Sequence, residues 1–149
     1  MTTTLLYTIG YERLLPPELL NELLVAKVER LIDVRGRPQS RRPGMSKTRL
    51  KQMLEDHGIA YEHRKALGTP PDIRFLFKAG DTAQARTAFA DHIEANHAAD
   101  LDALAAELED ARTPRTALIC LEADPAVCHR RVLAERLTVR LPALQVVDL

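Results

Sequence analysis

Residues 31–51 read LIDVRGRPQSRRPGMSKTRLK, an apolar strand that leads into a loop and a helix start with no acid after Asp33. Seven basic side chains gather here, although the whole chain balances 21 Lys and Arg against 21 Asp and Glu. Mutual repulsion makes such a cluster unfavourable unless an anion neutralises it, so the stretch predicts a site for phosphate, carboxylate or nucleic acid. A solvated surface loop is the alternative, but these charges begin at a strand end, where α/β proteins bind ligands. The basic residues are Arg35, Arg37, Arg41, Arg42, Lys47, Arg49 and Lys51.

Apolar, β-favouring runs alternate with helical patterns on both sides of this stretch. Helices are expected to begin at Pro16, after an N-cap at Ser46, and at Asp124 with Pro125, and an alanine-rich acidic arm over residues 81–112 is expected to break near Asn96. Strands that alternate with helices favour a parallel sheet covered on both faces. We therefore expect a single three-layer α/β domain over residues 1–149, with a mostly parallel sheet of about five strands. The strands are expected at 5–9, 28–34, 59–63, 116–121 and 143–147.

The composition is that of an ordinary soluble globule, with 46% hydrophobic and 28% charged residues. The N-terminal residues lack a basic region followed by a long apolar core, and no apolar run is long enough to span a bilayer. These features predict a cytoplasmic location and no membrane partner. The two cysteines, Cys120 and Cys128, are too few for a disulfide framework and are expected to be reduced in that compartment.

Polar residues follow three of the predicted strands at their carboxyl ends, which meet at one rim of a parallel sheet. Gly10, Tyr11 and Glu12 follow the first strand, and Asp33 and Arg35 end the second. We expect Gly10, Asp33, Arg35, Glu122, Cys128 and His129 to line one depression there. The other residues named here are expected to converge on the same rim, together with a group around the end of the fourth strand. That group is Cys120, Glu122, Cys128 and His129.

Three separated blocks carry a family resemblance: TIGYE at 8–12, DVR followed by RPQSRR within 33–42, and CLEADPAVCHRR at 120–131. With Gly58 and Tyr61 before Leu67 and Gly68, the chain resembles the domain of unknown function 488 family over nearly its whole length. The resemblance implies a compact three-layer α/β fold and no particular reaction. Met45 stands where relatives often carry an aromatic residue, and Thr69 where they often carry a second glycine. Carried over residue by residue, the resemblance singles out the following residues of this chain: Gly10, Asp33, Arg35, Pro38, Ser40, Arg41, Cys120, Glu122, Cys128, His129 and Arg130.

The arginine loop is the predicted ligand-binding part of the rim. Asp33 can fix Arg35 by charge-assisted hydrogen bonds and aim its guanidinium at an anion, or the two can form an ion pair that only holds the loop. Pro38, Pro43 and Gly44 punctuate the loop and favour a semi-rigid turn. The predicted ligand-binding residues are Gly10, Tyr11, Asp33, Arg35, Ser40, Arg41 and Arg130.

The block at 120–131 is the predicted place for chemistry, with Glu122, Cys128 and His129 as candidate catalytic residues. An N-cap at Asp124 would place Cys128 in the opening helical turn, where free amides favour a thiolate, although the charge of Asp124 opposes that shift. A buried, unreactive cysteine is the alternative. His129 can act as a general base with Glu122 as orienting carboxylate or acid, or it can be a core histidine satisfied by hydrogen bonds.

Cys120, Glu122, Cys128 and His129 also carry the ligand atoms that zinc or iron prefers. Adjacent residues of a helix project about 100° apart, so Cys128 and His129 are not expected to reach one ion, and no metal site is predicted. The sequence identifies no cofactor. The phosphate loops GxxxxGK[ST] and GxGxxG are absent, so ATP hydrolysis and dinucleotide binding lack support.

The leading hypothesis is an uncharacterised protein that binds a phosphate-bearing small molecule or nucleic acid at the rim, with possible hydrolase or transferase chemistry. A non-catalytic nucleic-acid-binding module is one alternative; the basic loop favours it, while the neutral charge, the few aromatics and the acidic arm oppose it. A sulfur or group transferase with Cys128 as carrier is the other. Whether the protein is catalytic, and its oligomeric state, stay open.

Overall fold

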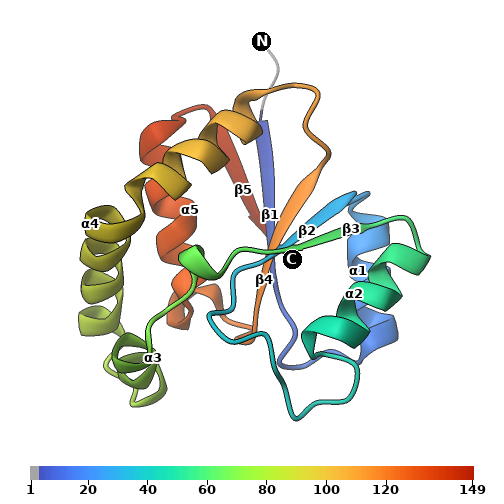
Figure 1. Cartoon of the computed structure of the whole chain (residues 1–149), viewed down its shortest axis with the longest axis horizontal. Coiled ribbons are helices and arrows are strands. Elements are labelled where there is room, and N and C mark those ends of the chain that lie inside the picture. The colour runs from blue at the N-terminus through green and yellow to red at the C-terminus, as the bar shows by residue number, and fades with distance from the viewer. Residues whose placement is uncertain (1–3) are drawn as a thin grey trace.

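The computed structural model describes residues 4–149 and contains one sheet of five parallel strands in the order β3-β2-β4-β1-β5 (Figure 1). The predicted three-layer α/β fold with a parallel sheet is confirmed. Residues 1–3 of the predicted domain lie outside the described part of the chain. The strands are β1 (Thr4–Gly10), β2 (Arg30–Asp33), β3 (Ala60–His63), β4 (Thr116–Cys120) and β5 (Leu144–Asp148).

Helices cover both faces of the sheet and bury two separate cores (Figure 1). The core under α1 and α2 includes Leu19, Leu31 and Leu50, and the core under α3, α4 and α5 includes Ile32 and Phe89. Leu31 and Ile32 are neighbours in β2 that face opposite cores, because side chains alternate across a strand. The helices are α1 (Pro16–Val25), α2 (Lys47–Asp56), α3 (Pro71–Lys78), α4 (Thr82–Glu109) and α5 (His129–Arg140), with short 3₁₀ turns η1 (Lys65–Leu67) and η2 (Pro125–Val127).

Local sequence signals explain several helix boundaries. Pro16 opens α1, and the Glu18 carboxylate accepts a hydrogen bond of 2.8 Å from the Leu15 amide. Gly58, with φ of 79°, follows the end of α2 in the left-handed conformation that glycine adopts freely. The long acidic helix α4 is broken at His97, where φ is −135°, next to the break expected near Asn96.

The segment after β4 differs from the expectation. Asp124 caps only the 3₁₀ turn η2, where its Oδ1 accepts a hydrogen bond of 2.9 Å from the Ala126 amide. The helix α5 begins at His129, and Cys128 is its N-cap residue with an extended backbone, φ −126° and ψ 148°. The prediction that Cys128 lies in an opening helical turn was therefore wrong, because the cap at Asp124 closes a short turn that ends before the cysteine.

All five strands run in one direction, so their carboxyl ends lie at one rim, and the loops that follow them occupy the lower part of Figure 1. The loop from β2 to α2, the loop after β3 and the segment from β4 to α5 meet there. A Cβ on Gly36 would lie 2.8 Å from the Thr69 carbonyl oxygen, and a Cβ on Gly68 would collide with Gly36, so the first two loops touch through glycines. Within residues 4–149, none of the helices has the length and apolar character that crossing a bilayer requires.

Candidate functional site

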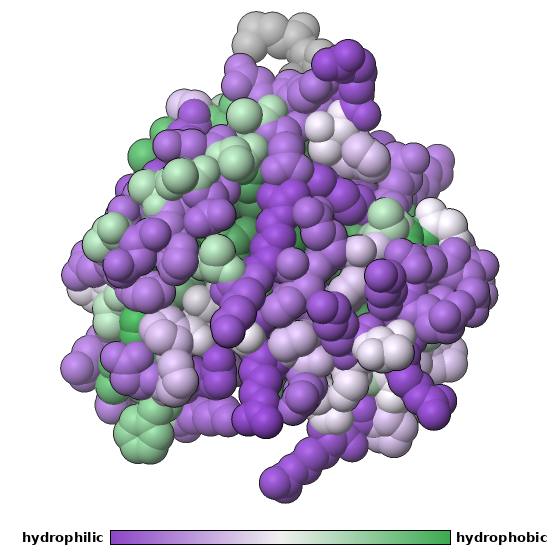
Figure 2. Space-filling model, in the orientation of Figure 1, coloured by the Kyte–Doolittle hydropathy of each residue, from purple (hydrophilic) through white to green (hydrophobic). Residues whose placement is uncertain are grey.

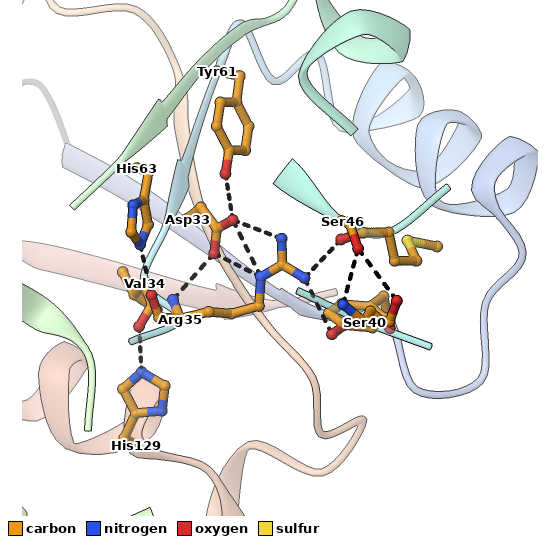
Figure 3. Close-up of polar contacts among 10 residues, drawn as sticks. Asp33, Val34, Arg35, Ser40, Ser46, Tyr61, His63 and His129 are labelled. Carbon is orange, nitrogen blue, oxygen red and sulfur yellow. Dashed lines mark hydrogen bonds and ion pairs between the residues drawn. The ribbon is translucent and has the colours of Figure 1, made fainter. Parts of the chain in front are cut away.

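A buried ion pair between Asp33 and Arg35 lies directly under the rim (Figure 3). Arg35 Nε donates to Asp33 Oδ1 at 2.9 Å and Oδ2 at 3.1 Å, and Arg35 Nη2 donates to Oδ2 at 2.8 Å. The Arg35 amide also donates to Asp33 Oδ1 at 3.0 Å. The two residues thus face the same side of the sheet, as their spacing of two at a strand end suggested.

The remaining Arg35 donors face two more partners. Its Nη1 donates to the Met45 carbonyl at 2.7 Å and to the Tyr11 hydroxyl at 3.2 Å. Burial by itself lowers the pKa of Arg35, but the hydrogen bond and charge of Asp33 outweigh it and raise that pKa above its ordinary value. Of the two readings of this pair, the geometry therefore favours an ion pair that holds the loop.

Tyr61 completes this network from β3. Its hydroxyl donates to Asp33 Oδ2, so the carboxylate is bound from two strands (Figure 3). Burial, together with this hydrogen bond, raises the pKa of Tyr61.

In the loop between β2 and α2, Ser46 Oγ accepts from the Ser40 amide at 3.0 Å and donates to the Ser40 carbonyl at 3.2 Å. Ser46 is the N-cap residue of α2 as expected, but its side chain closes the loop and makes no hydrogen bond to the helix.

Arg130 has a similar role under β4. It is fully buried, and its guanidinium donates to Thr8 Oγ1 at 3.1 Å, to the Ala123 carbonyl at 3.1 Å and to the Glu122 carbonyl. A Cβ on Gly10 would collide with the Glu122 carbonyl, so the chain after β4 can approach β1 only at a glycine. Arg130 and Gly10 therefore position the segment that carries Glu122.

Two histidines donate to carbonyl oxygens of the loop after β2. His129 Nε2 donates to the Val34 carbonyl at 2.7 Å, and His63 Nε2 donates to the Arg35 carbonyl at 2.7 Å (Figure 3). Burial, with smaller contributions from nearby arginines, lowers the pKa of His129 to about 4. His129 is thus neutral near pH 7 with its proton on Nε2, which leaves the Nδ1 lone pair free. That nitrogen lies 3.7 Å from Cys128 Sγ.

A hollow of about 270 Å³ opens above these residues, between the loop after β2 and the segment after β4. Glu122 and His129 belong to one wall, and Arg37, Arg74 and Lys78 bring three cations to the lining. Burial is the first cause of the raised pKa of Glu122, and the nearby charge of Glu12 adds to it. The hollow therefore contains cationic side chains and the carboxyl group of Glu122, whose charged form is disfavoured by burial.

A second, shallower hollow of about 880 Å³ lies beside the first. Both are lined by Arg37, Gln39 and Lys78, so they form one continuous surface that we call the basic trough. Arg41 and Lys47 add two more cations to the second hollow, which has no acidic lining residue. Figure 2 shows long hydrophilic side chains extending from this lower part of the molecule.

The cations of the basic trough differ from the other arginines in their partners. Arg30, Arg64, Arg136 and Arg140 all pair with carboxylates at 2.6 to 2.8 Å. Within residues 4–149, no carboxylate lies within ion-pair distance of the five trough cations. Those cations are Arg37, Arg41, Lys47, Arg74 and Lys78.

Cys120 and Cys128 are both buried and are joined in a disulfide, with Cα atoms 7.5 Å apart. This pairing differs from the expected reduced state. The short turn η2 lies between the end of β4 and the N-cap of α5, which is Cys128. Cys128 exposes only 1% of its surface, and among the described residues no cysteine is free, so the structure offers no accessible thiol for a group-transfer carrier.

The structure brings most of the predicted site residues to one rim, at different depths. Tyr11, Arg35, Glu122 and His129 line the first hollow, and Ser40 and Arg41 line the second. Beneath the surface lie Gly10, Asp33, Cys128 and Arg130.

Several residues of the basic trough were not among the predicted site residues. Arg37 and Lys47 belong to the basic run, so the charge pattern could have found them. Arg74 and Lys78 come from α3, and nothing in their local sequence marks them as neighbours of the loop after β2. Only the packing of α3 against the rim reveals them.

The parallel sheet, its rim-forming loops and the anchored arginine loop define a three-layer α/β protein with a polar, cation-rich rim. Residues 17–137 match a family described as a domain of unknown function, DUF488. The chain belongs to this DUF488 family, as its motifs suggested. No curated protein and no solved structure was found to match it.

Proposed function

We propose that the protein binds a compact phosphate-bearing ligand in the basic trough. The observation that supports this most directly is the set of unpaired cations around the second hollow: Arg37, Arg41, Lys47 and Lys78. Like charges held together without acidic partners repel one another, and a bound anion removes that repulsion. Guanidinium groups at Arg37 and Arg41 suit phosphate oxygens because they offer paired donors in one plane.

The start of α2 strengthens the case for an anion at this place. Lys47 and Thr48 lie in the first helical turn and line the hollow. Amides of a first turn have no intrahelical acceptor, and the helix dipole places partial positive charge there. The Lys47 amide donates to the Pro38 carbonyl at 2.9 Å, whereas the Ser46 hydroxyl is used within the loop and caps no amide of this turn.

The shape of the trough favours a compact ligand over a nucleic acid strand. The lining of the second hollow contains no aromatic side chain on which a base could stack. The unpaired cations gather around two adjoining hollows. The helix α4 meets the loop before α2 at one place, where Arg37 shares a pocket with His92 and His97, and no acidic residue of α4 lines either hollow.

The proposal assigns different roles to the arginines of the basic run. Arg35 and Arg130 use their donors within the protein and hold the rim, while Arg37 and Arg41 contact the ligand. Glu122 and His129 line the adjoining hollow. Hydrolase or transferase chemistry there, and the cytoplasmic location, stay predictions.

Calorimetric titration with a nucleoside 5′-monophosphate and with a short single-stranded oligonucleotide, each at two salt concentrations, tests the proposal. Arg37→Ala and Arg41→Ala should each weaken mononucleotide binding about 10- to 100-fold, since truncating a charge-assisted hydrogen bond costs about 1.5–3 kcal/mol. Arg49→Ala and Lys51→Ala are the matched controls, because these exposed α2 cations line neither hollow. They should bind like the wild type.

Two results would overturn the proposal. Equal losses from all four substitutions, with tight oligonucleotide binding and none for the mononucleotide, would favour a nucleic-acid-binding module. In that case affinity should fall steeply with salt, with a log–log slope of about −0.7 per neutralised phosphate. Absence of binding by either ligand would remove the anion site altogether.

A further inference from the structure

Three buried metal-ligating side chains converge below the first hollow, apart from the cations of the basic trough. The ligand atoms of Cys120, Cys128 and His129 all lie within 4.8 Å of one another. The three residues come from the end of β4 and the start of α5. Each exposes 7% or less of its surface, so their convergence belongs to the packed interior.

The orientation of His129 suits metal binding. Its Nε2–H is held by the Val34 carbonyl at 2.7 Å, and the opposite nitrogen, Nδ1, faces Cys128 Sγ at 3.7 Å. Metal-ligating histidines typically donate their other ring N–H to a carbonyl or carboxylate in this way, which fixes the ring and its tautomer.

Two of the ligand-atom spacings fit a tetrahedral ion, while the two sulfur atoms are bonded to each other and must move apart on reduction. Zinc–sulfur and zinc–nitrogen bonds of about 2.3 and 2.05 Å place neighbouring tetrahedral ligands about 3.6–3.8 Å apart. Cys128 Sγ lies 3.7 Å from His129 Nδ1, and Cys120 Sγ lies 3.7 Å from Glu122 Oε2. Cys128 and His129 are not separated by the 100° of adjacent helical residues, because Cys128 has an extended backbone and lies outside the helix.

The surroundings also suit two thiolates. Arg130 Nη1 donates to Cys120 Sγ at 3.1 Å, and a donor of this kind stabilises a metal-bound thiolate. The Cα atoms of the cysteines are 7.5 Å apart, beyond the usual disulfide span of about 4.4–6.8 Å. Once the sulfur atoms are reduced, this backbone separation leaves room for an ion between them.

We infer that the reduced protein binds one zinc ion through Cys120, Cys128 and His129, with the fourth position toward Glu122 and the first hollow. Two thiolates, one imidazole and an open position form a ligand set that zinc accepts in catalytic sites. When bound, such an ion supplies a Lewis acid or an activated water. The inference does not depend on anion binding in the basic trough.

Zinc binding requires a defined change of redox state. The disulfide takes up two electrons from a phosphine reductant and two protons from water, and the oxygen of that water converts the phosphine into the phosphine oxide. The two thiols then release two protons as their sulfur atoms bind Zn²⁺. The oxidised protein lacks the thiolates and is not expected to bind the ion.

Zinc titration of phosphine-reduced protein, with cobalt(II) spectroscopy as a second readout, tests the inference. The reduced wild type should bind one equivalent, and its cobalt form should show thiolate-to-metal charge-transfer bands. Cys128→Ser and His129→Gln should each weaken zinc binding more than about 100-fold, since losing even an outer-shell partner costs about 10- to 100-fold. The matched control is His63→Gln, which alters a histidine with the same carbonyl hydrogen bond outside the cluster and should bind zinc like the wild type.

The outcomes separate cleanly. A reduced wild type that binds no zinc, or a cobalt form without charge-transfer bands, would refute the site without any variant. Equal affinity of Cys128→Ser and the wild type would refute the ligand assignment. Circular dichroism of each apoprotein identifies a variant that fails to fold, and the wild-type spectra then decide.

Discussion

Arg35 and Arg41 come from one basic run, yet they occupy opposite environments. Arg35 is 6% exposed and uses its guanidinium to hold Asp33, Met45 and Tyr11 together, whereas Arg41 is exposed and lines a hollow. Arginine thus stabilises the structure at position 35 and is a candidate ligand contact at position 41. A buried charge must be paired or hydrogen-bonded, so the buried arginines act on stability and the exposed ones are free to act on a ligand.

The whole rim shows the same division between buried and exposed charged residues. Asp33, Arg35 and Tyr61 fix the loop after β2 from below, and Arg130 fixes the segment after β4. A ligand site works best when the elements that carry its contacts are themselves held rigidly. The interior network thus supports the surface cations. Substitutions in the network should lower stability, whereas substitutions of the surface cations should weaken ligand binding.

The largest loss of stability is expected from breaking the buried ion pair between Asp33 and Arg35. Asp33→Asn keeps the shape of the side chain but leaves Arg35 buried without a counter-charge, which costs about 3–5 kcal/mol of unfolding free energy. Urea unfolding measures the loss. Asp110→Asn, which breaks the exposed pair with Arg112, is the control and should change nothing resolvable. A loss below about 1 kcal/mol for Asp33→Asn would contradict the role given to the pair.

A smaller effect is expected at the close contact between β1 and the segment after β4. Gly10→Ala forces the Glu122 carbonyl and Arg130 to move, at a cost of about 1–3 kcal/mol. Gly58→Ala has open space around the added Cβ but a φ of 79°, so it measures backbone strain alone, about 1 kcal/mol. Only Gly10→Ala should shift the NMR resonances of Glu122 and Ala123. Unchanged resonances there would show that the contact does not position the rim.

The surface pairs of α4 with α5 should have the smallest effect on stability. Hydrogen bonds from Arg140 and Arg136, stronger than the opposing desolvation, lower the pKa of Glu94 to about 2. Because the folded-state pKa is depressed, this stabilisation is present above about pH 4.5 and fades as pH falls toward 2. Glu94→Gln should therefore cost about 1 kcal/mol at pH 7, after allowance for solvent screening. Unfolding curves at pH 7, 4 and 3 should show this cost shrinking.

Glu135→Gln is the matched control for that pH series. Glu135 pairs with Arg86 but its side chain is 51% exposed, so its loss should be smaller at every pH. A cost for Glu94→Gln that stays constant down to pH 3 would contradict the ion-pair explanation.

Much of the fold could be predicted from local patterns. The strand at Thr116–Cys120 is an apolar run buried at every position, and Pro16, Ser46 and Gly58 mark helix ends where chain geometry requires them. These signals depend on neighbours in sequence, so they can be read without the tertiary structure. The break in α4 at His97 was similarly close to its expected position.

The depth of each site residue could not be predicted in the same way. Arg130 is buried because Thr8 and the carbonyls of Glu122 and Ala123 surround it, and the link to Thr8 joins residues far apart in the chain. Lys78 reaches the basic trough only because α3 packs beside the loop after β2. A charge run shows where cations gather in sequence but not which of them the core buries.

The segment around Cys128 shows a different limit of prediction from sequence. A cap at Asp124 followed by Pro125 is typical of a helix start, and the first turn does form there. That turn is 3₁₀ and ends at Val127, so the cysteine becomes the cap of the next helix. A shift of four residues changed the direction of its side chain and brought it to Cys120 and His129.

The most direct test of the division between buried structural arginines and exposed ligand-binding cations is the effect of inorganic phosphate on thermal unfolding. A ligand that binds only the folded state raises its stability by RT ln(1 + [L]/Kd). Phosphate, compared with chloride at equal ionic strength, should raise the midpoint of the wild type and of Arg49→Ala, and clearly less that of Arg37→Ala and Arg41→Ala. Equal rises in all four proteins would show a general salt effect and contradict a phosphate site in the basic trough.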